Sequence, residues 1–236
     1  MLAYYGFYYD PTYFLVIIAA IISLIAQAKV NSAYSKYSRV YSRTNLTGRQ
    51  VCEILLRNKG IYDVSIERVS GRLTDHYDPT KKVLRLSDAT YDSSSLAALG
   101  VAAHECGHVM QHADGYAPLT IRSTIAPVAS VSSYASWGLI LFGLLFGGTT
   151  GDTFLKIGII AFTVVVLFQL ITLPVEFDAS KRALAMLGDN GILYGDEVKG
   201  AKKVLSSAAL TYVAAAATAI LQLLRLLIIL GGRRRD

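Results

Sequence analysis

One stretch decides how this chain is interpreted: residues 96–108, LAALGVAAHECGH. Serines at 93–95 offer helix N-caps just before it, and residues 96–103 are compact and apolar, as in a buried helix. Gly115 and then Pro118 supply a stop signal after it. The sequence therefore predicts a buried helix that carries an H-E-x-x-H pattern.

The H-E-x-x-H pattern at His104, Glu105 and His108 predicts a zinc site. Positions four apart lie on one helix face, so two imidazole nitrogens can reach one Zn²⁺ at roughly 2.0–2.1 Å. Glu105 lies about 100° around the helix from His104, where it flanks the metal and can take a proton from a zinc-bound water. The alternative is a buried helix with two hydrogen-bonded histidines. All four histidines fall between 76 and 112, which favours the metal site.

The composition is typical of a membrane protein. The chain has 236 residues, of which 53% are hydrophobic and only 17% are charged, and its mean hydropathy is +0.42. Four mostly apolar stretches approach the roughly 20 residues that a bilayer core requires. They are residues 11–27, 125–147, 155–175 and 208–230.

The first stretch is predicted to be a retained anchor. Residues 1–10 contain no Lys or Arg, so the basic start of a signal peptide is missing. Tyrosines crowd this end of the chain, as in the aromatic belt at a membrane interface.

Basic residues predict the orientation in the membrane. Five Lys or Arg and no acidic residue occur in residues 28–50, further lysines follow the third stretch, and the loop 148–154 has no basic residue. The positive-inside rule places 28–124 and 176–207 in the cytoplasm and the N-terminus outside. Arg233, Arg234 and Arg235 disagree with this if the fourth stretch crosses fully. Either that stretch is a hairpin or a tilted surface helix, or the short tail is tolerated.

These patterns divide the chain into five parts. We expect an anchor at 1–28, a cytoplasmic zincin-like part at 29–124, two transmembrane helices at 125–175, a third-ligand segment with a helix at 176–207, and a transmembrane helix with a basic tail at 208–236. Alternation in residues 62–69 and 83–86 predicts a β-hairpin or three-stranded ribbon. Its edge could hold an extended peptide. The expected fold is mainly α and polytopic, with a small α+β part.

Two further features exclude other classes. Cys52 and Cys106 are lone thiols without zinc-finger spacing. The net charge of +6 is explained by the basic flanks of the membrane stretches, and no aromatic–basic platform accompanies it. We therefore expect no nucleic-acid partner.

Four runs of sequence carry a family resemblance: residues 73–79 (LTDHYDP), 102–108 (AAHECGH), 174–180 (PVEFDAS) and 210–215 (LTYVAA). The chain resembles the YugP-type membrane zinc metallopeptidases of bacteria over nearly its whole length. The layout of that family is similar to the HtpX and CAAX-processing membrane peptidases, in which two histidines and a downstream glutamate bind zinc. The resemblance implies membrane proteolysis in a bacterial cell membrane.

Several residues can be weighed as the third zinc ligand. His112 lies about 12 Å along the helix from His104, so the three histidines cannot share one ion. Asp114 would fit a metzincin-like H-E-x-x-H-x-x-x-x-x-D pattern as the third ligand. In that pattern a glycine lets the chain turn toward the metal, and Gln111 replaces this glycine here. His76 stays open as an alternative.

Glu176 is the preferred third ligand. Two membrane stretches separate it from His108, which returns it to the same membrane face, and Pro174 predicts a fresh helical start beside it. The gluzincin resemblance implies a glutamate ligand in this region. Ser180 stands where that pattern has a supporting aspartate, a role that Asp178 can fill from another angle.

His76 and Tyr77 are candidates to stabilise the oxyanion that forms at the peptide carbonyl. The alternative is that residues 75–79 form a turn held by Asx hydrogen bonds. Arg122, just before the second stretch, is either a similar candidate or a cytoplasmic anchor.

The sequence thus predicts a membrane-embedded, zinc-dependent endopeptidase with a cytoplasmic active site. Its substrates would be peptides or membrane proteins, and its surroundings the lipid bilayer and any oligomeric or membrane-protein partners. One alternative is a non-proteolytic membrane adaptor with a structural zinc site. A channel or transporter ranks third, because no broken-helix signals occur in corresponding halves.

Overall fold

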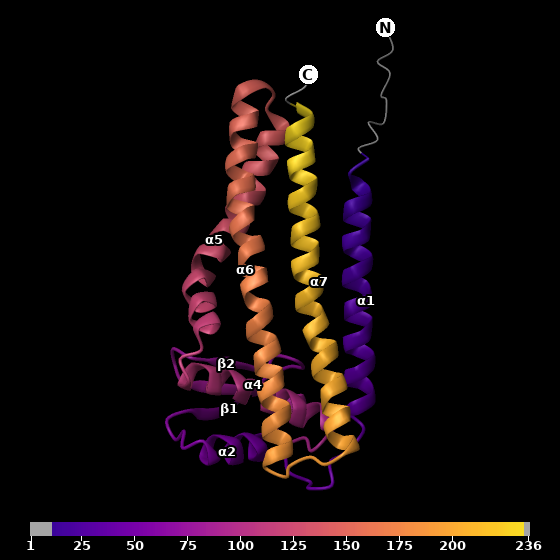
Figure 1. Cartoon of the computed structure of the whole chain (residues 1–236), viewed down its shortest axis with the longest axis vertical. Coiled ribbons are helices and arrows are strands. Elements are labelled where there is room, and N and C mark those ends of the chain that lie inside the picture. The colour runs from indigo at the N-terminus through magenta and orange to yellow at the C-terminus, as the bar shows by residue number, and fades with distance from the viewer. Residues whose placement is uncertain (1–10, 234–236) are drawn as a thin grey trace.

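Four long helices dominate the structure, a computed structural model that describes residues 11–233. They are α1 (Tyr13–Tyr37), α5 (Ala117–Leu145), α6 (Gly148–Asp189) and α7 (Asp196–Arg233), and they extend along the long axis of the molecule (Figure 1). The smaller elements gather at one end of this bundle. The prediction of a mainly α, polytopic protein is confirmed.

Each long helix is long and apolar enough to cross a membrane. Helix α6, with 42 residues, is about 63 Å long, roughly twice the thickness of a bilayer core. Its last part therefore extends beyond the core to the smaller elements. Helix α7 is one continuous helix, so the hairpin alternative for the fourth stretch is wrong. The tyrosines within residues 1–10, and residues 234 and 235 of the basic tail, lie outside the described residues.

Pro174 lies inside α6, so the prediction that a new helical segment begins there is wrong. Proline removes one backbone N–H from the helix, and neighbouring groups in a membrane protein can compensate for that loss. Helix α6 stays continuous through the proline. Helix α6 therefore extends without a break from the end of the bundle near Gly148 to the small elements at the other end.

A three-stranded sheet lies beside the lower end of the bundle. Its strands are β1 (Ser65–Val69), β2 (His76–Asp78) and β3 (Val83–Ser87), in the order β1-β3-β2. The two alternating runs that the sequence identified pair in parallel, while β2 pairs antiparallel with β3. The three-stranded alternative is confirmed and the hairpin is not, because β2 returns the chain between the two parallel strands.

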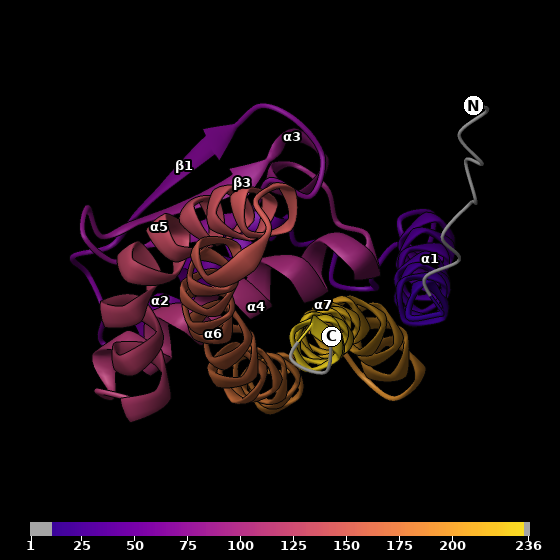
Figure 2. The ribbon, with the colours of Figure 1, turned by 90° about the horizontal axis from the view of Figure 1, so that it is seen from above.

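Helix α4 (Leu96–Ala113) lies near the lower ends of α6 and α7 (Figure 1) and runs across the bundle axis when seen from above (Figure 2). The Ser95 hydroxyl accepts a hydrogen bond from the Ala98 N–H at 3.2 Å and caps the helix, as the serine run predicted. Helix α2 (Gly48–Asn58) and the short α3 (Asp88–Tyr91) complete the α+β part. One apolar core joins these elements, with Leu55, Leu84, Leu99, Leu187 and Leu205 fully or almost fully buried.

Gly107 allows α4 and α6 to approach each other closely. A Cβ at this position would lie 2.6 Å from the Ala179 carbonyl oxygen. Since backbone atoms cannot move aside as a flexible side chain can, any larger residue would push the helices apart. The contact sets residues 104–108 of α4 directly against residues 176–180 of α6.

Candidate metal centre

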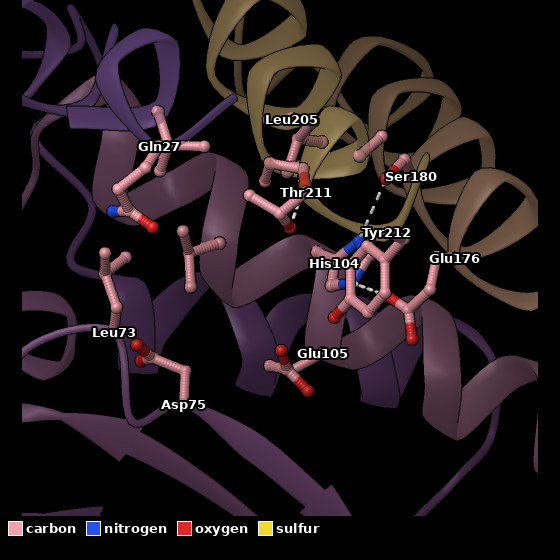
Figure 3. Close-up of a pocket in the computed structure, with 14 residues that line it drawn as sticks. Gln27, Leu73, Asp75, His104, Glu105, Glu176, Ser180, Leu205, Thr211 and Tyr212 are labelled. Carbon is pink, nitrogen blue, oxygen red and sulfur yellow. Dashed lines mark hydrogen bonds and ion pairs between the residues drawn. The ribbon is translucent and has the colours of Figure 1, made fainter. Parts of the chain in front are cut away.

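Three predicted ligands converge where α4 meets α6. The Nε2 atoms of His104 and His108 lie 3.3 Å and 3.7 Å from Oε2 of Glu176. One donor atom from each residue lies within 4.8 Å of the other two, so the group can hold one metal ion. Figure 3 shows two of the three residues, His104 and Glu176. The two histidines come from adjacent turns of α4, and the glutamate comes from α6.

The donor set fits zinc. Glu176 is 2% exposed, and its Oε2 atom is buried without a hydrogen bond to any other described residue. A buried carboxylate oxygen that receives no hydrogen bond is costly, and a bound cation removes that cost. Two imidazole nitrogens and one carboxylate oxygen are also a usual set of protein ligands in catalytic zinc sites, which keep a fourth position open.

Gln111 fixes the orientation of His108. Its amide nitrogen donates to the Val175 carbonyl at 2.8 Å and to the Asp178 carboxylate at 2.9 Å, which leaves its amide oxygen as an acceptor. That oxygen lies 3.0 Å from Nδ1 of His108. The proton of the neutral imidazole is therefore on Nδ1, and the lone pair of Nε2 is free to bind a metal.

Ser180 orients His104 in the same way. Its hydroxyl lies 3.1 Å from Nδ1 of His104, so the serine occupies the supporting position that the sequence left in doubt. Asp178 supports the other histidine indirectly, through Gln111, and also accepts a hydrogen bond from Arg182 at 2.6 Å.

Sequence reasoning missed the role of Gln111. It was considered only for the glycine that it replaces. A signal was present: Gln111 follows His108 by three positions on an apolar helix, so it lies on the same face. It is fully buried.

Two members of the triad, His104 and Glu176, line a cavity of about 300 Å³ between α1, α4, α6 and α7. Glu105 is 8% exposed and lines the same cavity. Within residues 11–233 its carboxylate forms no hydrogen bond or ion pair, so both oxygens are available to a water or a ligand. Residues of α1 and α7, such as Val30 and Leu205, supply apolar walls.

Two further side chains lie at this site. An Arg122 guanidinium nitrogen is 3.5 Å from Oε1 of Glu176, so this residue contacts the triad and is not only an anchor. Tyr212 of α7 lines the cavity beside Glu176 and His104 (Figure 3). Sequence reasoning gave Tyr212 no role, although it lies in one of the runs that carry the family resemblance.

The structure does not bring His76 and Tyr77 to the cavity lining. His76 is an exposed residue of β2 whose Nδ1 atom lies 2.8 Å from the Thr74 carbonyl oxygen. The Tyr77 hydroxyl lies 2.9 Å from Nδ1 of His112, two helical turns past His104. Strand β2 pairs with β3 and faces the far part of α4, which explains this placement. His112 and Asp114 also lie outside the triad, as predicted.

The electrostatic environment of His108 favours positive charge. Burial alone lowers the pKa of this imidazole, but the nearby carboxylates of Glu176 and Glu105 outweigh burial and raise the pKa above its usual value. A negative potential that favours a protonated ring also favours a metal cation at the same position.

Comparisons with known proteins agree with this centre. The family model described as "Putative neutral zinc metallopeptidase" matches residues 12–231. The "Putative membrane protease YugP" of Bacillus subtilis (strain 168) is 46% identical over 221 residues, which cover 93% of this chain and 97% of that protein. No solved structure matches the chain significantly. The zinc prediction is confirmed by the family and by the triad that can hold the ion.

Proposed function

Because the chain belongs to this zinc metallopeptidase family, as its sequence runs predicted, we propose that it is a membrane-embedded endopeptidase. Its substrates would be membrane or membrane-proximal proteins. One observation supports this most strongly: His104, His108 and Glu176 converge beside a cavity, and His104 and Glu176 line it together with the free carboxylate of Glu105.

The residues around the cavity divide the chemistry between them. When bound, Zn²⁺ supplies Lewis acidity, which activates water and polarises the scissile carbonyl. Glu105 takes a proton from the attacking water and passes it to the leaving amine. Ser180 and Gln111 keep the two imidazoles in the orientation in which Nε2 can bind the ion. The Tyr212 hydroxyl is our candidate for stabilising the oxyanion, in place of His76 and Tyr77.

The open cavity favours an enzyme over the adaptor alternative. Structural zinc sites are closed by four protein ligands, whereas a catalytic site keeps one position for water or substrate. Three protein ligands and an adjacent cavity match the catalytic pattern.

We place the site near the cytoplasmic surface of the membrane. Glu176 lies 28 residues after the start of α6, or about 42 Å along the helix, which exceeds a bilayer core of about 30 Å. The basic residues of 28–50 and 176–207 assign this end to the cytoplasm by the positive-inside rule. Peptide bonds that emerge just outside the core on that side would be within reach.

The function can be tested with purified protein in liposomes that contain a candidate membrane-protein substrate. We expect cleavage that stops when a strong chelator removes the metal and resumes after stoichiometric zinc is added back. Zinc should also raise the unfolding temperature, because a ligand that binds only the folded state stabilises it. Cleavage that persists in the metal-free protein would contradict the proposal.

Topology can be tested by cysteine labelling in a background without Cys52 and Cys106. A cysteine at Lys36 is expected to be shielded from a membrane-impermeant thiol reagent in intact cells and to react after lysis. A cysteine at Thr149, in the first turn of α6, is expected to react in intact cells. The reverse pattern would place the metal centre outside the cell.

A further inference from the structure

Asp75 has an unusual position in the wall of the metal-site cavity. It lies in the loop between β1 and β2, and its Oδ1 atom accepts a hydrogen bond from the Ser87 N–H at 2.8 Å. That bond holds the carboxylate in place against the sheet. The other oxygen, Oδ2, is buried and forms no hydrogen bond with any described residue.

The charges around the cavity are not balanced. Asp75, Glu105 and Glu176 all line it, whereas no Lys or Arg is among its lining residues. Glu176 has His104, His108 and Arg122 close by.

Asp75 forms no ion pair within residues 11–233. The nearby Arg72 lies over the Tyr34 ring, 4.4 Å from its centroid. Asp75 is half-buried, but its Oδ2 atom is buried without a hydrogen bond, which is costly, so a cation that enters the cavity would bind here favourably.

From this imbalance we propose that Asp75 is a specificity residue, which pairs with a Lys or Arg side chain of the substrate. The inference rests on the proposed peptidase function and names its substrate class. In the view of Figure 3, Glu105 lies between Asp75 and Glu176. We therefore expect the charged end of the substrate's Lys or Arg side chain and the scissile bond to occupy different parts of one cavity. Leu73, Val30 and Val101 line the same cavity and can contact the methylene stem of the basic side chain.

Substrates with a suitable Lys or Arg are expected at the proposed location of the site, near the cytoplasmic surface of the membrane. Segments that leave a membrane on its cytoplasmic side are enriched in Lys and Arg. A cavity at that level with an unpaired carboxylate would select the basic flank of a membrane-spanning segment. A free α-amine has similar chemistry, but an endopeptidase site requires the charge to come from a side chain.

The test compares peptides that differ in one side chain. N-acetylated peptides carry Lys, norleucine or Glu at successive positions around the scissile bond, and are offered to the zinc-loaded full-length protein in liposomes. The wild type is expected to cleave the best Lys peptide with a kcat/KM at least about tenfold above its norleucine counterpart. A matching peptide with a free α-amine and no Lys separates the two sources of positive charge.

Asp75→Asn is the decisive variant, because asparagine keeps an oxygen that can accept the Ser87 N–H while it removes the charge. We expect the Lys preference to fall to within about twofold, because the charge that distinguishes the Lys peptide from the norleucine peptide has been removed. Asp78→Asn is the matched control. Asp78 accepts N–H bonds from Thr80 and Lys81 and does not line the cavity, so that variant should keep the preference.

Three results would overturn the proposal: a wild type without any Lys preference, an Asp75→Asn variant that loses activity equally on all peptides, or a preference only for the free amine. Peptide binding to Glu105→Gln protein, with and without Asp75→Asn, is measured in parallel. If the wild type cleaves nothing, the peptidase function fails. The Lys-over-norleucine difference in binding, and its loss with Asp75→Asn, still decides the role of Asp75.

Discussion

Replacement of Glu105 by glutamine is expected to abolish peptide hydrolysis and to leave about one zinc ion per chain. The amide has nearly the shape of the carboxylate but cannot take a proton. A positioned general base contributes about 10²–10⁴-fold to a rate, so the loss should be at least a hundredfold. Zinc should stay because the triad of His104, His108 and Glu176 is unchanged.

Two measurements on the same preparation test this expectation: zinc content by elemental analysis, and initial cleavage rates in liposomes. Glu67→Gln is a matched control, since Glu67 is a glutamate on β1 that pairs with Arg85 at 3.2 Å and does not line the cavity. It should behave as the wild type. Wild-type rates in Glu105→Gln protein would exclude this residue as the base.

Replacement of Glu176 by alanine should remove both metal and activity. The variant loses one of three protein ligands. It also leaves Arg122 close to the metal position without its carboxylate partner, which adds repulsion. We expect zinc affinity to fall by more than about a hundredfold, beyond the 10–100-fold that is typical when a residue that only supports a ligand is changed. Competition with a chromogenic chelator measures the affinity.

The neighbours of Glu176 give graded controls. Ser180→Ala removes only the hydroxyl beside His104, so its effect on zinc affinity should be the smaller one. Asp114→Asn and His112→Ala should leave zinc stoichiometry nearly intact, because neither residue belongs to the triad. Wild-type zinc affinity in Glu176→Ala protein would show that another residue is the third ligand.

The sequence predicted those parts of the centre that depend on local geometry or on topology. His104 and His108 are one helical turn apart, so their convergence follows from the helix alone. Glu176 is far from His108 in the sequence, but the two membrane stretches between them predict that both residues lie on the same side of the membrane.

Other features depend on packing between distant segments, which no local pattern encodes. The position of Tyr212 depends on how α7 lies against α6, and the buried Gln111 gains its partners only when α6 packs against α4. At Pro174 a local rule failed, because the helix continues through the proline instead of restarting there. The parallel pairing of β1 with β3 could not be predicted either, because an alternating pattern identifies a strand but not the strand with which it pairs.

The hydrogen bonds of Gln111 couple zinc binding to the packing of α4 against α6. Its side chain joins the ring of His108 on α4 to the backbone and the carboxylate of α6. Coupling between two such events is reciprocal, so zinc must tighten the α4–α6 contact as much as that contact improves zinc binding. A substitution anywhere along α6 that shifts this helix should therefore be detectable as a changed zinc affinity, even when it lies far from the ion.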